Sequence, residues 1–406
     1  MALRSLAFCL LMVLVSVVAL APGAVEGSSR KLLAQANAAV AAQAYGICNA
    51  LVTVHGYRCQ EITVTTDDGY ILSVQRIGGG GTGKPPVIIQ HGVLVDAAVW
   101  LMNSPDKNLP LILADSGFDV WMANTRGTRF SRRHTSMDPS DPKFWNWSWD
   151  ELVAHDLPAV FNYVHGQTKQ KINYVGHSLG TLLALASLSE GKLVDQLKSV
   201  ALLTPIAYLT HMSTPICAVG ARLFAGEIIT AFRFAEFDPK GEPVAEFLDH
   251  LCATPGVPCY DIFSLLTGKN CCLNASTVDL FLDHQPQSTS TKNLVHLSQV
   301  VRNGILTKYD HGRSYTNYMH YGSFFAPHYD LSKIPNHLPM FITYGGQDAL
   351  SDELDVLHLL DHFKSHDAGK LVVDFIPEYA HFDFVAGINA KDLVYNKVIS
   401  FFNQQQ

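Results

Sequence analysis

The stretch KINYVGHSLGTLLALASLSE, residues 171–190, constrains the fold of this chain more than any other segment. A short apolar run leads into GHSLG, and a run rich in alanine and leucine leaves it. The GxSxG pattern alone is weak evidence, because it arises by chance in roughly one chain of this length in seven. A nucleophile elbow requires the setting found here, a predicted strand before the motif and a predicted helix after it. We therefore predict that Ser178, between Gly176 and Gly180, is a nucleophile.

A serine nucleophile needs a base and an orienting acid, and both are expected beyond later strands of the same sheet. Asp348 follows the predicted strand in PMFITYGG, and His381 follows the predicted strand in KLVVDFI. One helix and one strand separate them, as adjacent units of a parallel sheet require. Asp352 and Asp355 are alternative acids, but the pattern places them inside the next helix, facing solvent. The prediction is a triad of Ser178, Asp348 and His381.

Short apolar strands alternate with helices along most of the chain, which predicts βαβ units and a mostly parallel sheet. A β-hairpin over residues 61–77 precedes them. The alternation stops after Pro205 and resumes with PMFITYGG. We predict an α/β fold with a doubly wound, mostly parallel sheet, formed by residues 28–205 and 338–406. A helical cap, residues 206–337, is inserted between two of its strands.

Residues 1–27 have the composition of a secretory signal peptide. Arg4 precedes an apolar run that ends near Ala21, and small residues follow, so cleavage is expected after Ala24 or Gly27. The alternative is a membrane anchor, but the run is short for a span of about 20 residues. No later segment has the length and apolarity to cross a bilayer. These features predict a secreted protein, located outside the cell or in a vacuolar or lysosome-like compartment.

Cysteine usage agrees with secretion, because disulfides persist in oxidising compartments. Cys48 and Cys59 are close enough in the sequence to bond to each other. A second cluster has room for two more bonds in one of three pairings, and consists of Cys252, Cys259, Cys271 and Cys272. Cys217 is then the unpaired cysteine. A zinc site in the cluster is the alternative, but the spacing lacks two CxxC arms.

Two Asn-x-Ser sequons fit the same secretory route, and each is a candidate glycosylation site. They begin at Asn146 and Asn274. Asn146 lies in the aromatic run FWNWSW, which we expect to pack inward. Asn274 is therefore the better candidate.

The charge balance argues against one class of partner, and the motifs argue against several cofactors. The net charge of −7, without a basic cluster longer than two residues, gives no surface that would neutralise nucleic-acid phosphates. GGGGTGK is no Walker motif, since Lys84 is followed by Pro85. His358, His362 and His366 recur at helical spacing, but a solvated helix face explains them better than a metal site, because the carboxylates that a metal would need are not arrayed with them. We expect no nucleic-acid partner, no metal and no organic cofactor.

The segment QHGVLVD has two interpretations. In many serine hydrolases a His-Gly pair after a strand supplies the upstream half of an oxyanion hole through a backbone N–H. The same residues, His91 to Asp96, match the HxxxxD pattern of some acyltransferases. The first interpretation is favoured because a serine triad is already predicted.

Several motifs together resemble the acid lipase family of α/β-hydrolases, which includes gastric and lysosomal lipases of animals and extracellular triacylglycerol lipases of plants. Plant triacylglycerol lipases show the closest resemblance. The motifs occur in the family's order across residues 56–402 and are IQHGVLVDAAVW, LILADSGFDVWMANTRGTRFSRRH, FWNWSWDELVAHDLPA, NYVGHSLGT, YGGQDALSD and YAHFDF. The nucleophile, acid and base of the family fall on Ser178, Asp348 and His381.

The resemblance also implies an α/β-hydrolase fold and an oxyanion hole. Its donors fall on the backbone amides of Val93 and Leu179. Leu179 departs from the glutamine common in animal members. Because the donor is the backbone N–H, this departure should alter substrate contacts more than the chemistry.

By resemblance, the expected activity is that of a serine lipase that hydrolyses lipid esters, above all triacylglycerols, to fatty acids through an acyl-enzyme. The cap stretches VGARLFAGEIITAFRF and FLDHLCATPG fit a lid that meets acyl chains or a lipid–water interface. They fit the core of a helical subdomain equally well. Alternatives on the same fold are a short-chain carboxylesterase, a lipid transacylase and a non-catalytic ligand-binding protein, and the complete triad disfavours the last.

Overall fold

A computed structural model of the chain describes residues 46–78, 83–214 and 266–405, and, between the last two ranges, 218, 221, 222, 224, 226, 227, 230, 234–239, 241 and 264. The predicted signal peptide, the cap stretch FLDHLCATPG, and Cys217, Cys252 and Cys259 lie outside these residues. Within the described part of the chain, no helix combines the length and apolarity needed to span a lipid bilayer.

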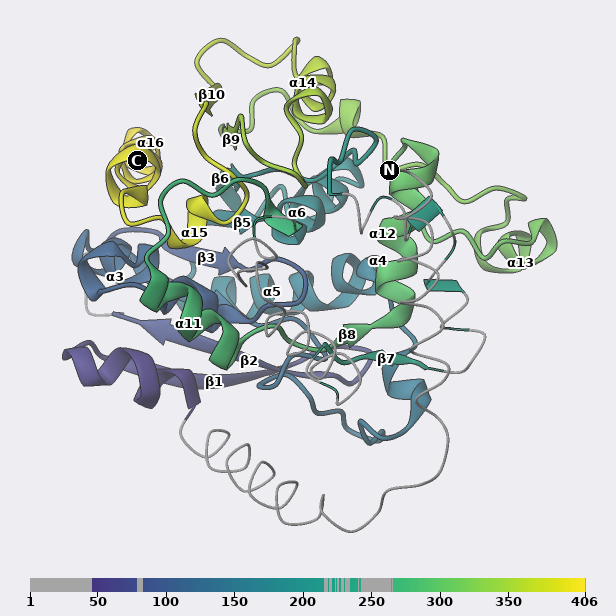
Figure 1. Cartoon of the computed structure of the whole chain (residues 1–406), viewed down its shortest axis with the longest axis horizontal. Helices are drawn as coiled ribbons and strands as arrows, with labels where there is room; N and C mark the ends of the chain where they lie inside the picture. The colour runs from purple at the N-terminus through teal and green to yellow at the C-terminus, as the bar shows by residue number, and fades with distance from the viewer. Residues whose placement is uncertain are drawn as a thin grey trace, which may run out of the picture.

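Eight strands form one sheet at the centre of the molecule, in the order β1-β2-β4-β3-β5-β6-β9-β10 (Figure 1). Strands β1 and β2 form the predicted antiparallel hairpin, and β2 pairs antiparallel with β4. All other neighbours are parallel. The strands are β1 (Cys59–Thr65), β2 (Ile71–Ile77), β3 (Pro86–Gln90), β4 (Asp119–Ala123), β5 (Ile172–His177), β6 (Leu197–Leu203), β9 (Met340–Gly345) and β10 (Leu371–Ile376).

Helices cover both faces of this sheet, which confirms the predicted doubly wound arrangement. Strands β3, β5 and β9 are buried along their whole length, as expected for parallel strands between two helical layers. One apolar core includes side chains of α5 (Leu157–Thr168), α6 (Leu179–Ser189) and α14 (Glu353–Asp361). The core on the other face includes side chains of α3 (Leu109–Asp115), α15 (Asp383–Ala386) and α16 (Asn396–Gln404).

Residues 149–168 are helical throughout, but the winding is uneven. The segment begins as α4 (Trp149–Glu151), where Ser148 and Glu151 make a reciprocal capping box. A π-helical turn, Leu152–Asp156, then leads into α5. Pro158 stands in the first turn of α5 and has no N–H to donate to the preceding turn. The missing donor gives a physical reason for the wider turn just before it.

A buried arginine ties this helix to the hairpin. Arg126 follows β4 and pairs with Asp68 of the β1–β2 turn at 2.7 Å and with Asp156 at 2.6 Å. Its guanidinium also lies 3.8 Å from the ring centre of Tyr70. With Arg126 buried, breaking one of these pairs would leave an uncompensated charge, which costs about 3–5 kcal/mol.

The aromatic run FWNWSW packs inward, as predicted, but Asn146 does not follow it. The side chains of Phe144, Trp145, Trp147 and Trp149 are all buried. Asn146 ends a short 3₁₀ turn and is exposed. The expectation that the run would carry Asn146 inward was wrong, because the turn points this one side chain outward. Asn274, the N-cap of α11, is also exposed.

The chain leaves the sheet after Leu203 and returns at Met340, although β6 and β9 are parallel neighbours. The described part of this excursion includes helices α11 (Ala275–His284), α12 (Thr291–Asn303) and α13 (Ser314–Tyr321). A two-residue ladder joins β7 (Glu236–Phe237) to β8 (Thr289–Ser290). Figure 1 shows α12 beside the body of the molecule and α13 at its outer margin. The bounds 206–337 for the cap stay a prediction.

Two disulfides join described cysteines. Cys48 bonds to Cys59, as predicted. Cys271 bonds to its neighbour Cys272, which is compatible with one of the three pairings considered for that cluster. The bond lies in the segment that leads into α11, beside the loop after β10.

Candidate active site

Ser178 occupies the turn between β5 and α6 in a backbone conformation rare for a residue with a side chain. Its φ is 54° and its ψ is −118°. The Ser178 amide donates to the carbonyl of Leu203 on the neighbouring strand β6 at 3.2 Å. A strained serine between a buried strand and a buried helix is the geometry of a nucleophile elbow.

The flanking glycines make this turn sterically feasible. A Cβ atom at Gly176 would lie 2.7 Å from the backbone C and O atoms of Gly180. A Cβ at Gly180 would lie 2.7 Å from the carbonyl oxygen of Gln90 on β3. Both contacts are with backbone atoms, so no side chain can rotate away to relieve them. The elbow therefore needs glycine at both positions.

Asp348 and His381 meet at the carboxyl ends of β9 and β10. The Nδ1–H of His381 donates to Asp348 Oδ2 at 2.9 Å, with Oδ1 at 3.1 Å. Asp348 Oδ1 also accepts from the amides of Leu350 and Ser351, at 2.9 and 2.8 Å. Both partners are buried. These bonds fix the orientation of the imidazole and leave its Nε2 unused by the carboxylate.

His177, the residue before the serine, links the elbow to the histidine loop. Its Nε2–H donates to the carbonyl of His381 at 3.0 Å, and the two ring centres are 4.8 Å apart. Burial, with help from the neighbouring His381, lowers the pKa of His177 well below its usual value. His177 thus stays neutral and holds the His381 main chain next to Ser178. The Ser178 hydroxyl has no hydrogen-bond partner among the described residues.

The loop after β3 packs directly against the serine. A Cβ atom at Gly92 would lie 3.0 Å from Ser178 Cβ and 3.4 Å from Ser178 Oγ. The next residue, Val93, and Leu179 line a small pocket at this point. Neither of their amides donates to a backbone carbonyl in the part of the chain that the structure describes. Two unused amides beside a serine hydroxyl can bind an anionic oxygen.

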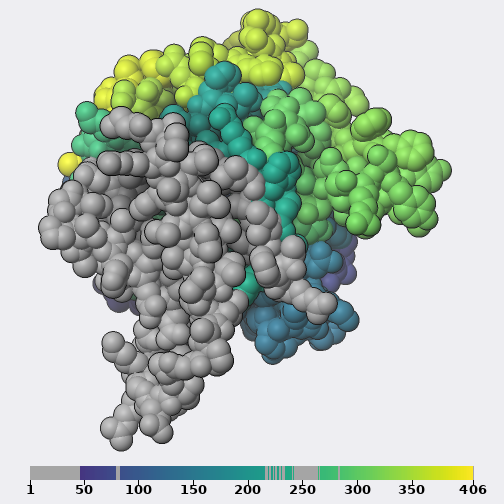
Figure 2. All heavy atoms as spheres, turned by 45° about the vertical axis from the view of Figure 1, so that its right-hand side comes forward, coloured from purple at the N-terminus to yellow at the C-terminus, as the bar shows by residue number. Residues whose placement is uncertain are grey.

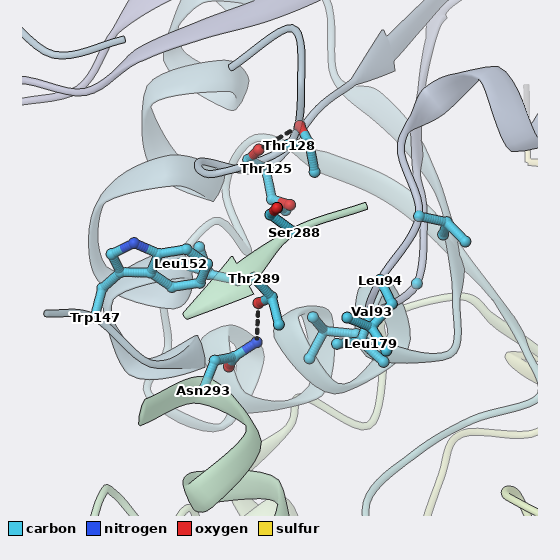
Figure 3. Close-up of a pocket in the computed structure, with 12 residues that line it drawn as sticks. Val93, Leu94, Thr125, Thr128, Trp147, Leu152, Leu179, Ser288, Thr289 and Asn293 are labelled. Atoms are coloured by element: carbon cyan, nitrogen blue, oxygen red, sulfur yellow. Dashed lines mark hydrogen bonds between the residues drawn. The ribbon is translucent and has the colours of Figure 1, made fainter. Parts of the chain in front are cut away.

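Figure 3 shows residues that line this pocket. Val93, Leu94 and Leu179 lie together on one side, and Trp147 and Leu152 lie across from them. The excursion between β6 and β9 also contributes to the lining, where the side-chain amide of Asn293 donates to Thr289 Oγ1 at 3.2 Å. The same excursion bonds to the Val93 loop, since the Gln287 amide donates to the Leu94 carbonyl at 2.7 Å. The pocket is therefore closed by residues far apart in the sequence.

His91 has no free nitrogen for chemistry. Its Nδ1 donates to the carbonyl of Gly92 at 2.7 Å, and its Nε2 accepts from the amide of Thr125 at 3.1 Å. Burial lowers the pKa of His91. Asp96 bonds elsewhere, to the amide of Ala98 and to Arg129. The acyltransferase interpretation of His91 and Asp96 therefore finds no support in the geometry.

The two alternative acids, Asp352 and Asp355, form hydrogen bonds away from His381. Asp352 is the N-cap of α14 and accepts from the amide of Leu354 at 2.9 Å. Asp355 was expected to face solvent, and this expectation was wrong. Its carboxylate is buried and accepts from the amide and the ring Nδ1 of His211, at 2.9 and 2.8 Å. Only Asp348, of the three, contacts His381 among the described residues.

The three spaced histidines have separate partners. The ring of His358 stacks on Tyr208 at 4.2 Å between centres, and His362 Nε2 bonds to the Tyr208 hydroxyl at 2.7 Å. His366 Nε2 donates to the carbonyl of Leu338 at 2.7 Å. Their arrangement serves packing and hydrogen bonding.

The sequence did not reveal a segment that holds the loop carrying His381. The carbonyl of Thr267 accepts from the His381 amide at 3.1 Å, and Asn270 Oδ1 accepts from the next amide, that of Phe382, at 3.1 Å. The amides of Cys271 and Cys272 both donate at 3.1 Å to the buried carboxylate of Asp383. Residues 267–272, which we call the clamp segment, thus reach the loop that carries the histidine. The adjacent cysteines were its only visible mark in the sequence.

Comparisons with known proteins identify the family of this chain. Residues 85–386 match the α/β hydrolase fold family, and residues 48–104 match a partial α/β-hydrolase lipase region. Triacylglycerol lipase 2 of Arabidopsis thaliana is 55% identical over 89% of this chain and 88% of its own length. The chain belongs to the acid lipase family of α/β-hydrolases.

Animal acid lipases and one solved lipase structure extend the comparison. The human lysosomal acid lipase/cholesteryl ester hydrolase is 35% identical over 88% of this acid lipase and 90% of its own chain. A solved structure described as a lipase in its open form has a TM-score of 0.55 at 16% identity, covering 86% of this chain and 99% of its own. The latter shows a shared fold. Both agree with the fold predicted from the sequence.

Proposed function

We propose that this acid lipase is a secreted serine hydrolase that cleaves the ester bonds of lipids, triacylglycerols above all, through an acyl-enzyme. One observation carries the proposal: Ser178 stands in a strained turn directly after His177, which bonds to the main chain of His381, and Asp348 orients the His381 imidazole. The fold class supports ester chemistry. The substrate class comes from the relatives, which are named as triacylglycerol and cholesteryl ester lipases.

The mechanism follows from the positions of the groups. His381 Nε2 takes the proton of Ser178, whose Oγ attacks the ester carbonyl. The backbone amides of Val93 and Leu179 bind the oxyanion of the tetrahedral intermediate. Asp348 fixes the imidazole tautomer and stabilises its positive charge. His381 then protonates the leaving alcohol, activates a water molecule, and so releases the fatty acid from Ser178.

Secretion is supported by the predicted signal peptide and by the chemistry of the mature chain. The disulfide between Cys48 and Cys59 favours an oxidising compartment. Asn146 and Asn274 both present exposed sequons for glycosylation. We propose a place outside the cell or in a vacuolar or lysosome-like compartment.

Fatty-acid release from a triolein emulsion tests the proposal. The secreted wild type should release fatty acid, and Ser178→Ala should lower the rate to the level of the emulsion without enzyme, because the acyl-enzyme cannot form. Thermal unfolding of both proteins, followed by circular dichroism, controls for loss of structure. Release that persists in a folded Ser178→Ala protein would refute the nucleophile.

Two further readouts separate the alternatives. A short-chain carboxylesterase would cleave soluble esters and lose activity as the acyl chain grows. A transacylase would move the acyl group to an added alcohol in preference to water. A folded wild type that turns over neither substrate would be a non-catalytic ligand-binding protein.

A further inference from the structure

Helix α13 and the turn after it carry apolar side chains outward. Tyr315, Tyr318 and Met319 have the spacing of one helix face, and Phe324 and Phe325 follow directly. All five side chains are exposed: Tyr315 by 72%, Tyr318 by 48%, Met319 by 66%, Phe324 by 57% and Phe325 by 78%. The rings of Tyr318 and Phe324 stack 5.1 Å apart. We call these five residues the aromatic face.

The inner side of the same helix is polar, which reverses the usual order of a surface helix. Asn317 is the buried residue of α13. Its side chain accepts from the amide of His311 at 3.0 Å and donates to Asp310 at 2.9 Å. Tyr321 donates its hydroxyl to the carbonyl of Tyr309 at 2.9 Å. These bonds hold the helix in place, so the outward position of its apolar side chains is fixed by the fold.

The aromatic face projects from the body of the molecule. In Figure 1, α13 lies at the outer margin, beyond α12, and in Figure 2 the same green region stands out at the right. A projecting convex surface suits contact with a broad, flat partner better than enclosure of a small molecule. An exposed apolar surface of this kind marks an interaction site.

Composition indicates what the partner is. Tyrosine and phenylalanine favour the boundary between water and acyl chains, where a ring meets lipid and a hydroxyl meets water. No Asp or Glu occurs between His311 and Tyr329, while Arg313 is exposed at the start of the helix. An aromatic face with a cation and no carboxylate complements an anionic lipid surface.

We propose that the aromatic face docks this acid lipase onto the phospholipid-covered surface of a lipid particle, and this inference rests on the proposed lipase function. Docking would keep the enzyme at the particle between catalytic cycles. The face contains none of the residues assigned to the chemistry. It should therefore affect hydrolysis of dispersed lipid and leave hydrolysis of a soluble ester unchanged.

The test compares two sets of substitutions in the full-length secreted protein. The first changes the aromatic face by Tyr315→Gln, Met319→Gln and Phe325→Ser, and leaves the stacked Tyr318 and Phe324 in place. The control changes Leu354→Gln and Leu357→Gln, two exposed apolar residues of α14. Binding is measured by co-sedimentation with vesicles of phosphatidylcholine containing phosphatidylglycerol, and with vesicles of phosphatidylcholine alone. Thermal unfolding confirms that both variants fold.

The expected result is binding by the wild type that is stronger on the anionic vesicles. The face variant should bind at least about tenfold more weakly. It should lose activity on a phospholipid-coated triolein emulsion and keep wild-type turnover of a soluble short-chain ester. The α14 variant should match the wild type in every assay.

Three outcomes would overturn the proposal. Equal vesicle binding by wild type and face variant is the first, and equal loss of binding by the α14 variant is the second. The third outcome is that the wild type is a dimer in sedimentation velocity, whereas the face variant is a monomer with unchanged lipid binding. The aromatic face would then join two copies of the chain. Failure of the lipase proposal looks different, since the wild type itself would then release no fatty acid from the emulsion, whatever its vesicle binding and its turnover of the soluble ester.

Discussion

At the scale of single residues, the nucleophile elbow depends on Gly176 and Gly180, where the fold leaves no room for a side chain. Gly180 approaches the carbonyl of Gln90 so closely that a Cβ would lie 2.7 Å away. The backbone of Ser178 is strained, because its φ is positive. The turn is thus stable only because β3, β5 and α6 hold it from three sides.

Gly180→Ala should lower the free energy of unfolding by about 1–3 kcal/mol, because either β3 or α6 must shift to admit the methyl group. The same shift would move the Leu179 amide and reduce turnover of a soluble ester. Urea unfolding and ester hydrolysis measure the two effects. The matched control is Gly166→Ala in α5, where a Cβ meets nothing within 4 Å. It should stabilise the protein by about 0.5–1 kcal/mol, and equal effects at both positions would contradict the steric explanation.

The sequence predicted Asp348 and His381 because both follow strands whose ends must meet at one edge of a parallel sheet. It failed for Asp355 and Asn146 because the environment of one side chain depends on distant segments and local turns. Asp355 is buried by its bonds to His211, far away in the sequence. No periodicity within either segment contains that information.

At the scale of elements, the clamp segment is the part of the site that patterns could not reveal. The strands and helices of the sheet were predictable from their apolar periodicity. The clamp segment works through main-chain amides and carbonyls, which every residue has, so its sequence carries no signature. It contacts the buried carboxylate of Asp383, which accepts from the amides of Cys271 and Cys272 and from the amide of Ala380 in the histidine loop.

Asp383→Ala should therefore destabilise the protein by about 3 kcal/mol, because the amides of Ala380, Cys271 and Cys272 all lose their acceptor and the amide of Ala380 stays buried. The loop that carries His381 would loosen, and kcat on a soluble ester should fall with it. Asp383→Asn keeps one acceptor oxygen and should cost less. Chemical denaturation and steady-state kinetics give both numbers.

The control for this element is Asp361→Ala. Asp361 pairs with Lys364 at the surface at 2.9 Å, and an exposed pair of this kind contributes little to stability. If the two alanine variants unfold at the same denaturant concentration, the clamp segment does not hold the histidine loop.

At the scale of the whole molecule, buried histidines make stability depend on pH. Burial lowers the pKa of His296 to about 3, and it also lowers the pKa of His91 and His177. A histidine in the unfolded chain titrates near pH 6.5. The neutral ring is thus favoured by folding, and the stability it supplies is complete above about pH 6.5 and is lost as the pH falls. Asp150 has the opposite effect, because burial raises its pKa to about 6. The stability that its neutral carboxyl group contributes to the protein is lost as the pH rises from about 4 through 6.

A single substitution isolates the histidine contribution. His296→Gln can keep the hydrogen bond to the Thr307 carbonyl but loses the ring that stacks on Trp149. At pH 8 the wild type should be the more stable protein. Below about pH 6.5 the difference should shrink by on the order of 1 kcal/mol per pH unit, because only the wild type must take up a proton on unfolding. Urea unfolding at a series of pH values measures it, and parallel profiles would show that His296 does not titrate in this way.

The insertion between β6 and β9 has a consequence for how such a protein can change over time. The entropy of closing a loop grows only with the logarithm of its length, so doubling the excursion from Leu203 to Met340 costs on the order of 0.6 kcal/mol. Apart from the clamp segment, which holds the histidine loop, the length of the chain between these two strands has little effect on the stability of the sheet. Descendants of one ancestor can lengthen, trim or exchange the rest of that excursion while inheriting the catalytic sheet unaltered. The range of substrates can therefore change in evolution without loss of the fold.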